Sequence, residues 1–141
     1  MGFLDRSKPR KVAGSLYIAT VKQARQPFLY TKFGVPDTFE GRFNMISLHV
    51  FLVLRRLKSN FTRSEKTSQA LFDVMFADMD HSLREIGVGD LRVGKNVKAM
   101  VASFYGRVSA YEKALRDESD VLLIDAINRN VFSKNQLVQT K

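Results

Sequence analysis

Apolar residues recur at spacings of three and four through most of the chain, which is the pattern of amphipathic helices. An alternating, strand-like pattern is confined to the short segment 89–93. The spacing predicts five helices, over residues 15–26, 38–58, 65–86, 93–116 and 120–129. We therefore expect the all-α fold class, with a single compact domain of about five helices.

The ends of the chain and the breaks between helices set the expected domain limits. Residues 1–13 are predicted to form a basic flexible arm, 14–132 the all-helical domain, and 133–141 a frayed tail. Pro27 should end the first helix, and residues 28–36 should connect it to the second. Asp37, with Glu40 three positions later, matches a capping box, so Asp37 is the expected cap of the second helix.

The second helix is apolar on two opposite sides. One side carries Phe39, Phe43, Ile46, Val50, Leu54 and Leu57, and the other carries Met45, Leu48, Phe51 and Leu52. Such a helix is either enclosed in the core or presents a surface to a partner. The candidate partner-binding residues are Arg42, Met45, Leu48, His49, Phe51 and Leu52. The alternative is burial beneath the first or last helix. The next candidate surface is then the face of small residues formed by Ala99, Ala102, Ser103, Gly106 and Ala110.

Charge is unevenly distributed along the chain. The net charge is +9, and residues 1–35 hold seven Lys and Arg against one Asp. Basic regions of this kind favour acidic proteins, RNA or an anionic membrane surface as partners. Apolar runs fall short of the roughly 18–20 residues that a membrane span requires. The absence of cysteine excludes a disulfide framework, a zinc–thiolate site and a thiol nucleophile.

Few residue patterns in the chain point to catalysis or to a bound cofactor. Asp78, His81 and Glu85 share one flank of the third predicted helix and form at most half of a metal site, because a di-metal bundle requires matching ligands from facing helices. No carboxylate is placed in sequence to orient His49 as a base. Glycine-rich phosphate loops are also missing. We therefore expect no enzymatic activity, no catalytic residues, no metal and no cofactor.

Several ordered segments resemble one known family. They are Gly34 to Phe43, Leu48 to Leu57, Ser68 to Asp73, Phe76 to Asp80, Leu83 to Asp90, and Phe104 to Arg107 continuing to Tyr111. In these segments the chain is similar to the ubiquinol–cytochrome c chaperone family, and the likeness extends over about residues 15–132. It departs from mitochondrial members in lacking their long N-terminal region and in having Phe51 where relatives often place Trp.

The resemblance implies a non-enzymatic assembly chaperone for complex III, of the short bacterial type. Mitochondrial members of the family act with a small partner protein and hold newly made cytochrome b until it enters the complex. The implied partners are therefore cytochrome b or another subunit of the cytochrome bc complex, together with a small partner protein. The basic charge of residues 1–35 adds an anionic membrane surface as a further expected partner.

A second function class stays open beside the chaperone. The basic segments also fit a helical protein that binds RNA or the ribosome, although no named RNA-binding motif is present. RNA binding should weaken steeply with salt, whereas binding of an apolar client should not. The expected location is the cytoplasm, with peripheral association at the inner membrane as the alternative.

Overall fold

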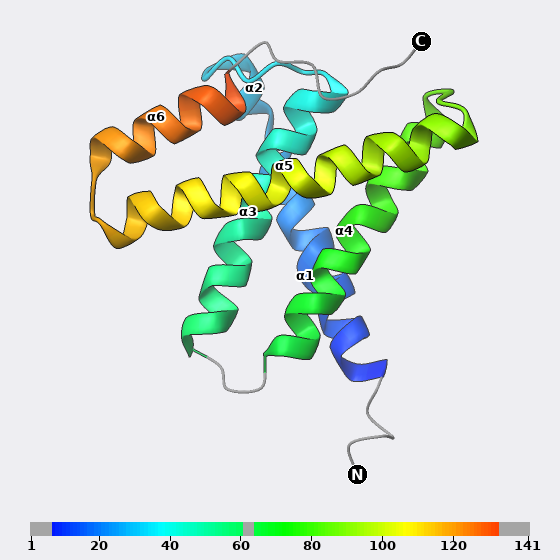
Figure 1. Ribbon diagram of the computed structural model, residues 1–141, viewed down its shortest axis with the longest axis horizontal. Helices are drawn as coiled ribbons and strands as arrows, with labels where there is room; N and C mark the ends of the chain where they lie inside the picture. The colour runs from blue at the N-terminus through cyan, green and yellow to red at the C-terminus, as the bar shows by residue number, and fades with distance from the viewer. Residues whose placement is uncertain (1–6, 61–63, 133–141) are drawn as a thin grey trace.

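The computed structural model describes residues 7–60 and 64–132, and within these ranges all regular structure is helical. The helices are α1 (Ser7–Ala24), α2 (Pro27–Thr31), α3 (Phe39–Asn60), α4 (Glu65–Glu85), α5 (Asp90–Arg116) and α6 (Asp120–Val131). Five of them correspond to the predicted helices, and α2 is a short addition. Figure 1 shows α5 crossing in front of α3 and α4, with α6 folded back beside it. The expected all-α class is confirmed.

The main core lies where α1, α3, α4 and α5 meet. Large side chains that are at most 1% exposed form its centre: Phe43, Val50, Leu71, Met75, Leu83, Val93, Met100 and Phe104. Phe76 packs against both Phe43 and Phe104, with ring centroids 6.5 and 5.9 Å away. Aromatic side chains bury large areas, so this cluster supplies much of the driving force for folding.

A second, smaller cluster lies on the opposite side of α3. Phe51 is 3% exposed and packs against Tyr111 of α5, with the ring centroids 5.5 Å apart. Ala126 and Ile127 of α6 cover this pair, and Leu48 joins it from α3. Helix α3 is therefore packed on both of its apolar sides, although Leu52 of the second side is 48% exposed.

Helix α1 begins earlier than the sequence suggests. It starts at Ser7, and Ala13 is fully buried, so residues 7–13 belong to the helix and not to the expected flexible arm. Pro9 is tolerated because its missing N–H lies in the first turn, where no intrahelical acceptor exists. Residues 1–6 and 133–141, the rest of the expected arm and tail, lie outside the described residues.

The segment after α1 holds a one-turn helix, α2, where a connector over residues 28–36 is expected from the sequence. Pro27 ends α1 as predicted but also begins α2, where it occupies the first position. The Tyr30 hydroxyl donates to the carbonyl of Ala24 over 3.1 Å, so α2 is tied back to the last turn of α1. Gly34 then adopts a φ of 76°, a left-handed conformation that glycine accepts without steric cost.

The cap of α3 is also displaced by one residue from the predicted position. The hydroxyl oxygen of Thr38 accepts from the backbone N–H of Gly41 over 3.0 Å, which is the bond of an N-cap side chain. Asp37 instead pairs with Arg42, Oδ1 to Nη1, at 3.1 Å. The prediction of Asp37 as the cap is therefore wrong, because Thr38 directly precedes the first helical residue.

One side-chain bond joins α1 to α4 near the core. The hydroxyl of Tyr17 donates to Oδ2 of Asp78 over 2.5 Å. Burial raises the pKa of Tyr17 above its ordinary value, and the hydrogen bond to the Asp78 carboxylate raises it further. The contact fixes the rotation of α1 about its axis, because Tyr17 lies on the same face as buried Ala13 and Ala24.

We expect Phe51→Ala to lower the free energy of unfolding by roughly 3–5 kcal/mol, since it leaves a cavity between α3, α5 and α6. The matched control is Leu52→Ala, because Leu52 is the next residue and is 48% exposed. That change should stay within about 0.5 kcal/mol. Urea denaturation followed by circular dichroism measures both values. Equal effects of the two substitutions would contradict the enclosed position of Phe51.

A second prediction concerns alkaline pH. As pH rises past the ordinary tyrosine pKa of about 10, the unfolded chain releases the Tyr17 proton while the folded chain retains it. Stability should therefore fall with rising pH, by up to about 1.4 kcal/mol per pH unit for this one proton. Tyr17→Phe should make the fall shallower, whereas Tyr105→Phe, at an exposed tyrosine, should not. Urea curves recorded across this pH range give the slopes, and identical slopes for wild type and Tyr17→Phe would refute the assignment.

Candidate functional site

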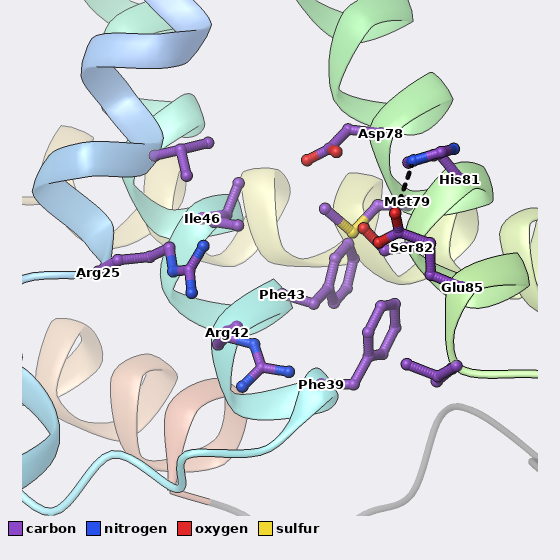
Figure 2. A pocket seen from close by; sticks show the side chains of 12 residues that line it. Arg25, Phe39, Arg42, Phe43, Ile46, Asp78, Met79, His81, Ser82 and Glu85 are labelled. Carbon is purple, nitrogen blue, oxygen red and sulfur yellow. Dashed lines mark ion pairs between the residues drawn. The ribbon is translucent and has the colours of Figure 1, made fainter.

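A groove opens between α1, α3 and α4, with a volume of about 420 Å³ (Figure 2). Its walls come from Val21 of α1 and Arg25 directly after it, Phe39, Arg42, Phe43 and Ile46 of α3, Asp78, Met79, His81, Ser82 and Glu85 of α4, and Ile86. Three helices far apart in sequence thus build one concave surface. A hollow of this size can accept a few apolar side chains of a partner.

The floor of the groove is apolar and fixed. Phe43, Ile46 and Met79 are each no more than 5% exposed, because they belong to the main core and show only an edge to the groove. Phe39 is half-buried, while Ile86 is 51% exposed. An apolar group that enters the groove would therefore meet a preformed floor and a rim with unburied aliphatic surface.

The rim separates charges of opposite sign. Arg25 follows α1 and Arg42 belongs to α3, whereas the carboxylates Asp78 and Glu85 come from α4, and Figure 2 shows the two sets facing each other across the groove. His81 Nε2 lies 3.0 Å from Glu85 Oε1. Both side chains of this pair are largely exposed, so the pair contributes little to stability and is accessible to a ligand.

The structure divides the predicted partner-binding residues into two groups. Met45 and Phe51 are 5% and 3% exposed, and Leu48 is partly buried in the cluster under α6, so these three are packing residues in the folded chain. Leu52 is exposed, and Arg42 lines the groove.

His49 is half-buried, and its ring bonds to the backbone of its own helix. Its Nδ1 lies 2.7 Å from the carbonyl oxygen of Met45, one turn earlier. On the face of small residues of α5, Ala99, Ala102 and Gly106 are exposed, while Ser103 and Ala110 are half-buried.

A second hollow, of about 550 Å³, lies between α3 and α5. Phe51, Leu54 and Val108 form its apolar part, and Arg55, Lys58, Ser59, Glu112 and Arg116 surround them. Arg55 Nε is 3.4 Å from Glu112 Oε2. Lys58 and Arg116 stand in the last turns of their helices, where cations compensate the negative end of the helix dipole. Their position therefore has a structural explanation that requires no ligand.

The contributions of α1 and α4 to the groove are not visible in the sequence pattern. Periodicity assigns Val21, Phe39 and Met79 to buried faces but cannot show that these faces leave a hollow between them. A signal was nevertheless present, because Phe39, Arg42 and Phe43 stand in one family-like segment, Asp78 and Met79 in another, and Glu85 and Ile86 in a third.

The described residues contain no group of three His, Asp or Glu side chains arranged to hold a metal ion. Of the set considered from sequence, Asp78 accepts from Tyr17 and His81 pairs with Glu85. Within the same described ranges, no helix combines the length and apolar composition that a bilayer span requires.

Comparisons with known proteins agree with the resemblance seen in the sequence. Residues 31–141 match the model of the ubiquinol–cytochrome c chaperone family. Ubiquinol–cytochrome c reductase complex assembly factor 1 of Xenopus laevis is 23% identical over 139 residues, covering 95% of this chain and 69% of the relative. The mouse protein of the same name is 25% identical and is covered over 47% of its length. The chain thus spans about half the length of its mouse and human relatives.

A solved structure extends the comparison to the fold. The crystal structure of the Cbp3 homolog from Brucella abortus superimposes with a TM-score of 0.78 and 42% sequence identity. The match covers 92% of this chain and 72% of the Brucella chain. By its sequence, its helical fold and these matches, the chain belongs to the ubiquinol–cytochrome c chaperone family of complex III assembly factors.

Proposed function

We propose that this protein is a non-enzymatic chaperone that binds newly made cytochrome b and holds it for assembly into complex III. Membership of the chaperone family supports the general role, and the relatives are named as assembly factors of ubiquinol–cytochrome c reductase. The proposal adds the client, its docking surface on this chain and the absence of a chemical step.

The observation that carries the proposal is the convergence of three family-like segments on one groove. These segments are separated by more than 30 residues along the chain at their widest spacing, yet each supplies walls to the same hollow. Packing of the core alone explains why Phe43 and Met79 meet. It does not require half-buried Arg42 and exposed Ile86, which shape the rim.

The chemistry of the groove suits an apolar membrane protein before its own helices have paired. An unpaired transmembrane segment presents large aliphatic and aromatic side chains, which the floor formed by Phe43, Ile46 and Met79 can contact. Polar groups at the end of such a segment can pair with either the Arg42 side or the Glu85 side of the rim. The groove thereby accepts an apolar group bordered by polar ones without requiring a particular sequence.

The size of the groove also limits affinity in a way that suits a chaperone. Each fully buried large apolar side chain contributes about 1.5–3 kcal/mol, and association itself costs at least about 4 kcal/mol. Two or three side chains therefore give modest net affinity from this groove alone. A client held in this way can be released when its permanent partners compete for the same apolar surface.

Among the residues proposed from sequence, Arg42, His49 and Leu52 remain candidates for direct contact. Arg42 stands at the rim, and Leu52 is on the solvent side of the same helix. Met45, Leu48 and Phe51 hold α3 in place from within the core.

Ile86→Asp should weaken the capture of cytochrome b at least tenfold, because it places an unpaired charge at the apolar rim of the groove. The change should leave the free energy of unfolding within about 0.5 kcal/mol, since Ile86 is 51% exposed. The measurement is the amount of cytochrome b that co-purifies with the tagged full chain from detergent-solubilised membranes of cells that make a cytochrome bc complex.

Leu91→Asp is the matched control for this experiment. Leu91 is an aliphatic residue in the same α4–α5 corner, is 90% exposed and does not line the groove. Capture of cytochrome b should be unchanged in this variant. Equal capture by wild type, Ile86→Asp and Leu91→Asp would remove the groove from the proposal, and failure of the wild-type protein to capture cytochrome b would remove the client.

A further inference from the structure

The corner between α1 and α2 presents two phenylalanines to solvent. Phe28 is 41% exposed and Phe33 is 62% exposed, and their rings pack edge to face with centroids 5.9 Å apart. Single exposed apolar side chains are common on protein surfaces. Two aromatic side chains that contact each other and protrude together form a patch, and such a patch indicates an interaction site.

The backbone holds this aromatic pair in a fixed position. Leu29 and Tyr30 take the inward positions of α2 and pack against the main core, which leaves Phe28 facing outward. The N–H of Phe33 donates to the carbonyl of Phe28 over 3.2 Å, and the N–H of Val35 donates to Leu29 over 3.2 Å. The pair is therefore preorganised, so little conformational entropy remains to be lost when it binds.

The charged residues that flank the pair along the chain are basic. Lys22, Arg25 and Lys32 are exposed on the flanking segments, and the sequence from residue 6 to residue 36 contains no Asp or Glu. The nearest following carboxylate, Asp37, is paired with Arg42.

The outer side of α1 continues the same chemistry toward its N-terminus. Lys11, Ile18, Lys22 and Arg25 share one helical stripe, at spacings of seven, four and three residues. Ile18 is 72% exposed on this stripe. An aliphatic side chain among cations has no folding role at that position, because it contacts solvent and not the core.

We propose that the aromatic corner of Phe28 and Phe33, with the basic stripe of α1 that leads to it, docks this protein on an anionic phospholipid surface. Lys and Arg contact the phosphate groups while the two rings enter the interfacial layer, which is the established division of labour in peripheral membrane attachment. This inference rests on the corner and the basic stripe, and it does not require the client groove, although Arg25 borders both.

A lipid surface fits these residues better than RNA does. Nucleic-acid bases stack on free aromatic faces, whereas in the edge-to-face pair one of the rings turns a face to its neighbour. Ile18 can enter a lipid interface but offers no plane for stacking. RNA binding is therefore the competing outcome of the experiment and not a second proposal.

The chain lacks tryptophan, which gives a site-specific reporter. Phe33→Trp should show a blue-shifted emission on addition of phosphatidylcholine vesicles containing phosphatidylglycerol, and brominated acyl chains in those vesicles should quench it. Leu91→Trp, at an exposed position on α5, should show neither effect. Pure phosphatidylcholine vesicles should bind much more weakly, and added salt should weaken binding to the anionic vesicles.

Substitutions in the otherwise native sequence, followed by vesicle co-sedimentation, separate the two components of the corner. Lys22→Gln and Lys32→Gln should each weaken binding about fivefold, corresponding to about 1 kcal/mol per cation near the surface. Phe28→Ser with Phe33→Ser should weaken it more than tenfold. Lys95→Gln, at an exposed lysine of α5, is the matched control and should have little effect.

Three results would overturn the proposal. The first is equal binding to neutral and anionic vesicles, and the second is an equal response of Phe33→Trp and Leu91→Trp to lipid. The third is saturable binding of a single-stranded RNA that shifts the Phe33→Trp emission while anionic vesicles do not. Because purified protein and vesicles contain no cytochrome b, these results leave the proposed client untouched, and failure of client capture leaves the lipid proposal untouched.

Discussion

The fold depends on covering both apolar sides of α3. Phe43, Ile46 and Val50 on one side require α1 and α4, whereas Leu48 and Phe51 on the other require α5 and α6. A helix with apolar residues on opposite sides cannot be stable at a surface. The remaining helices are therefore arranged around α3, and Figure 1 shows α5 crossing it. The groove forms where α1 and α4 separate along the N-terminal part of α3.

Much of this architecture is readable from residue spacing. The long helices follow from stripes at three and four residues, and four of their five starting positions are predicted within about three residues. Helix α2 cannot be predicted in this way, because one turn is too short to show a period. The hydrogen bond from Tyr30 to Ala24 that holds it also forms only in the folded chain. The early start of α1 is not predicted, because Ala13 is the one buried position over residues 8–13 and a single position shows no period. The neighbouring Lys8, Arg10 and Lys11 are charged and exposed.

The candidate site is less readable, for a related reason. Two opposite apolar sides on α3 are visible in the sequence, but which residues stay exposed depends on where α6 lies. Phe51 and Leu52 are neighbours with similar chemistry, yet one is 3% exposed and the other 48%. The difference comes from Ala126 and Ile127, about 75 residues later in the chain. Prediction of the groove likewise requires the relative positions of α1, α3 and α4, which residue spacing does not give.

A buried arginine of α5 lies against the floor of the groove. Arg107 is 7% exposed, and its guanidinium carbon lies 5.1 Å from the centre of the Phe43 ring. Its Nε and Nη1 have no hydrogen-bond partner among the described residues, and burial lowers its pKa. A buried guanidinium costs free energy that a cation–π contact only partly offsets. The Phe43 ring contacts the Arg107 guanidinium of α5, and Phe43 also forms part of the groove floor. A ligand that moves Phe43 therefore also changes the surroundings of Arg107.

The proposed client groove and the proposed lipid corner meet at one residue. Arg25 lines the groove and also stands at the end of the basic stripe, three residues before Phe28. A substitution at Arg25 would alter both surfaces, whereas Ile86 belongs to the groove alone and Phe33 to the corner alone. The two proposed surfaces therefore adjoin at Arg25. Exposure of apolar surface to water is the main cost of moving an apolar segment. Adjoining surfaces for lipid and for an apolar client shorten the path over which that cost applies.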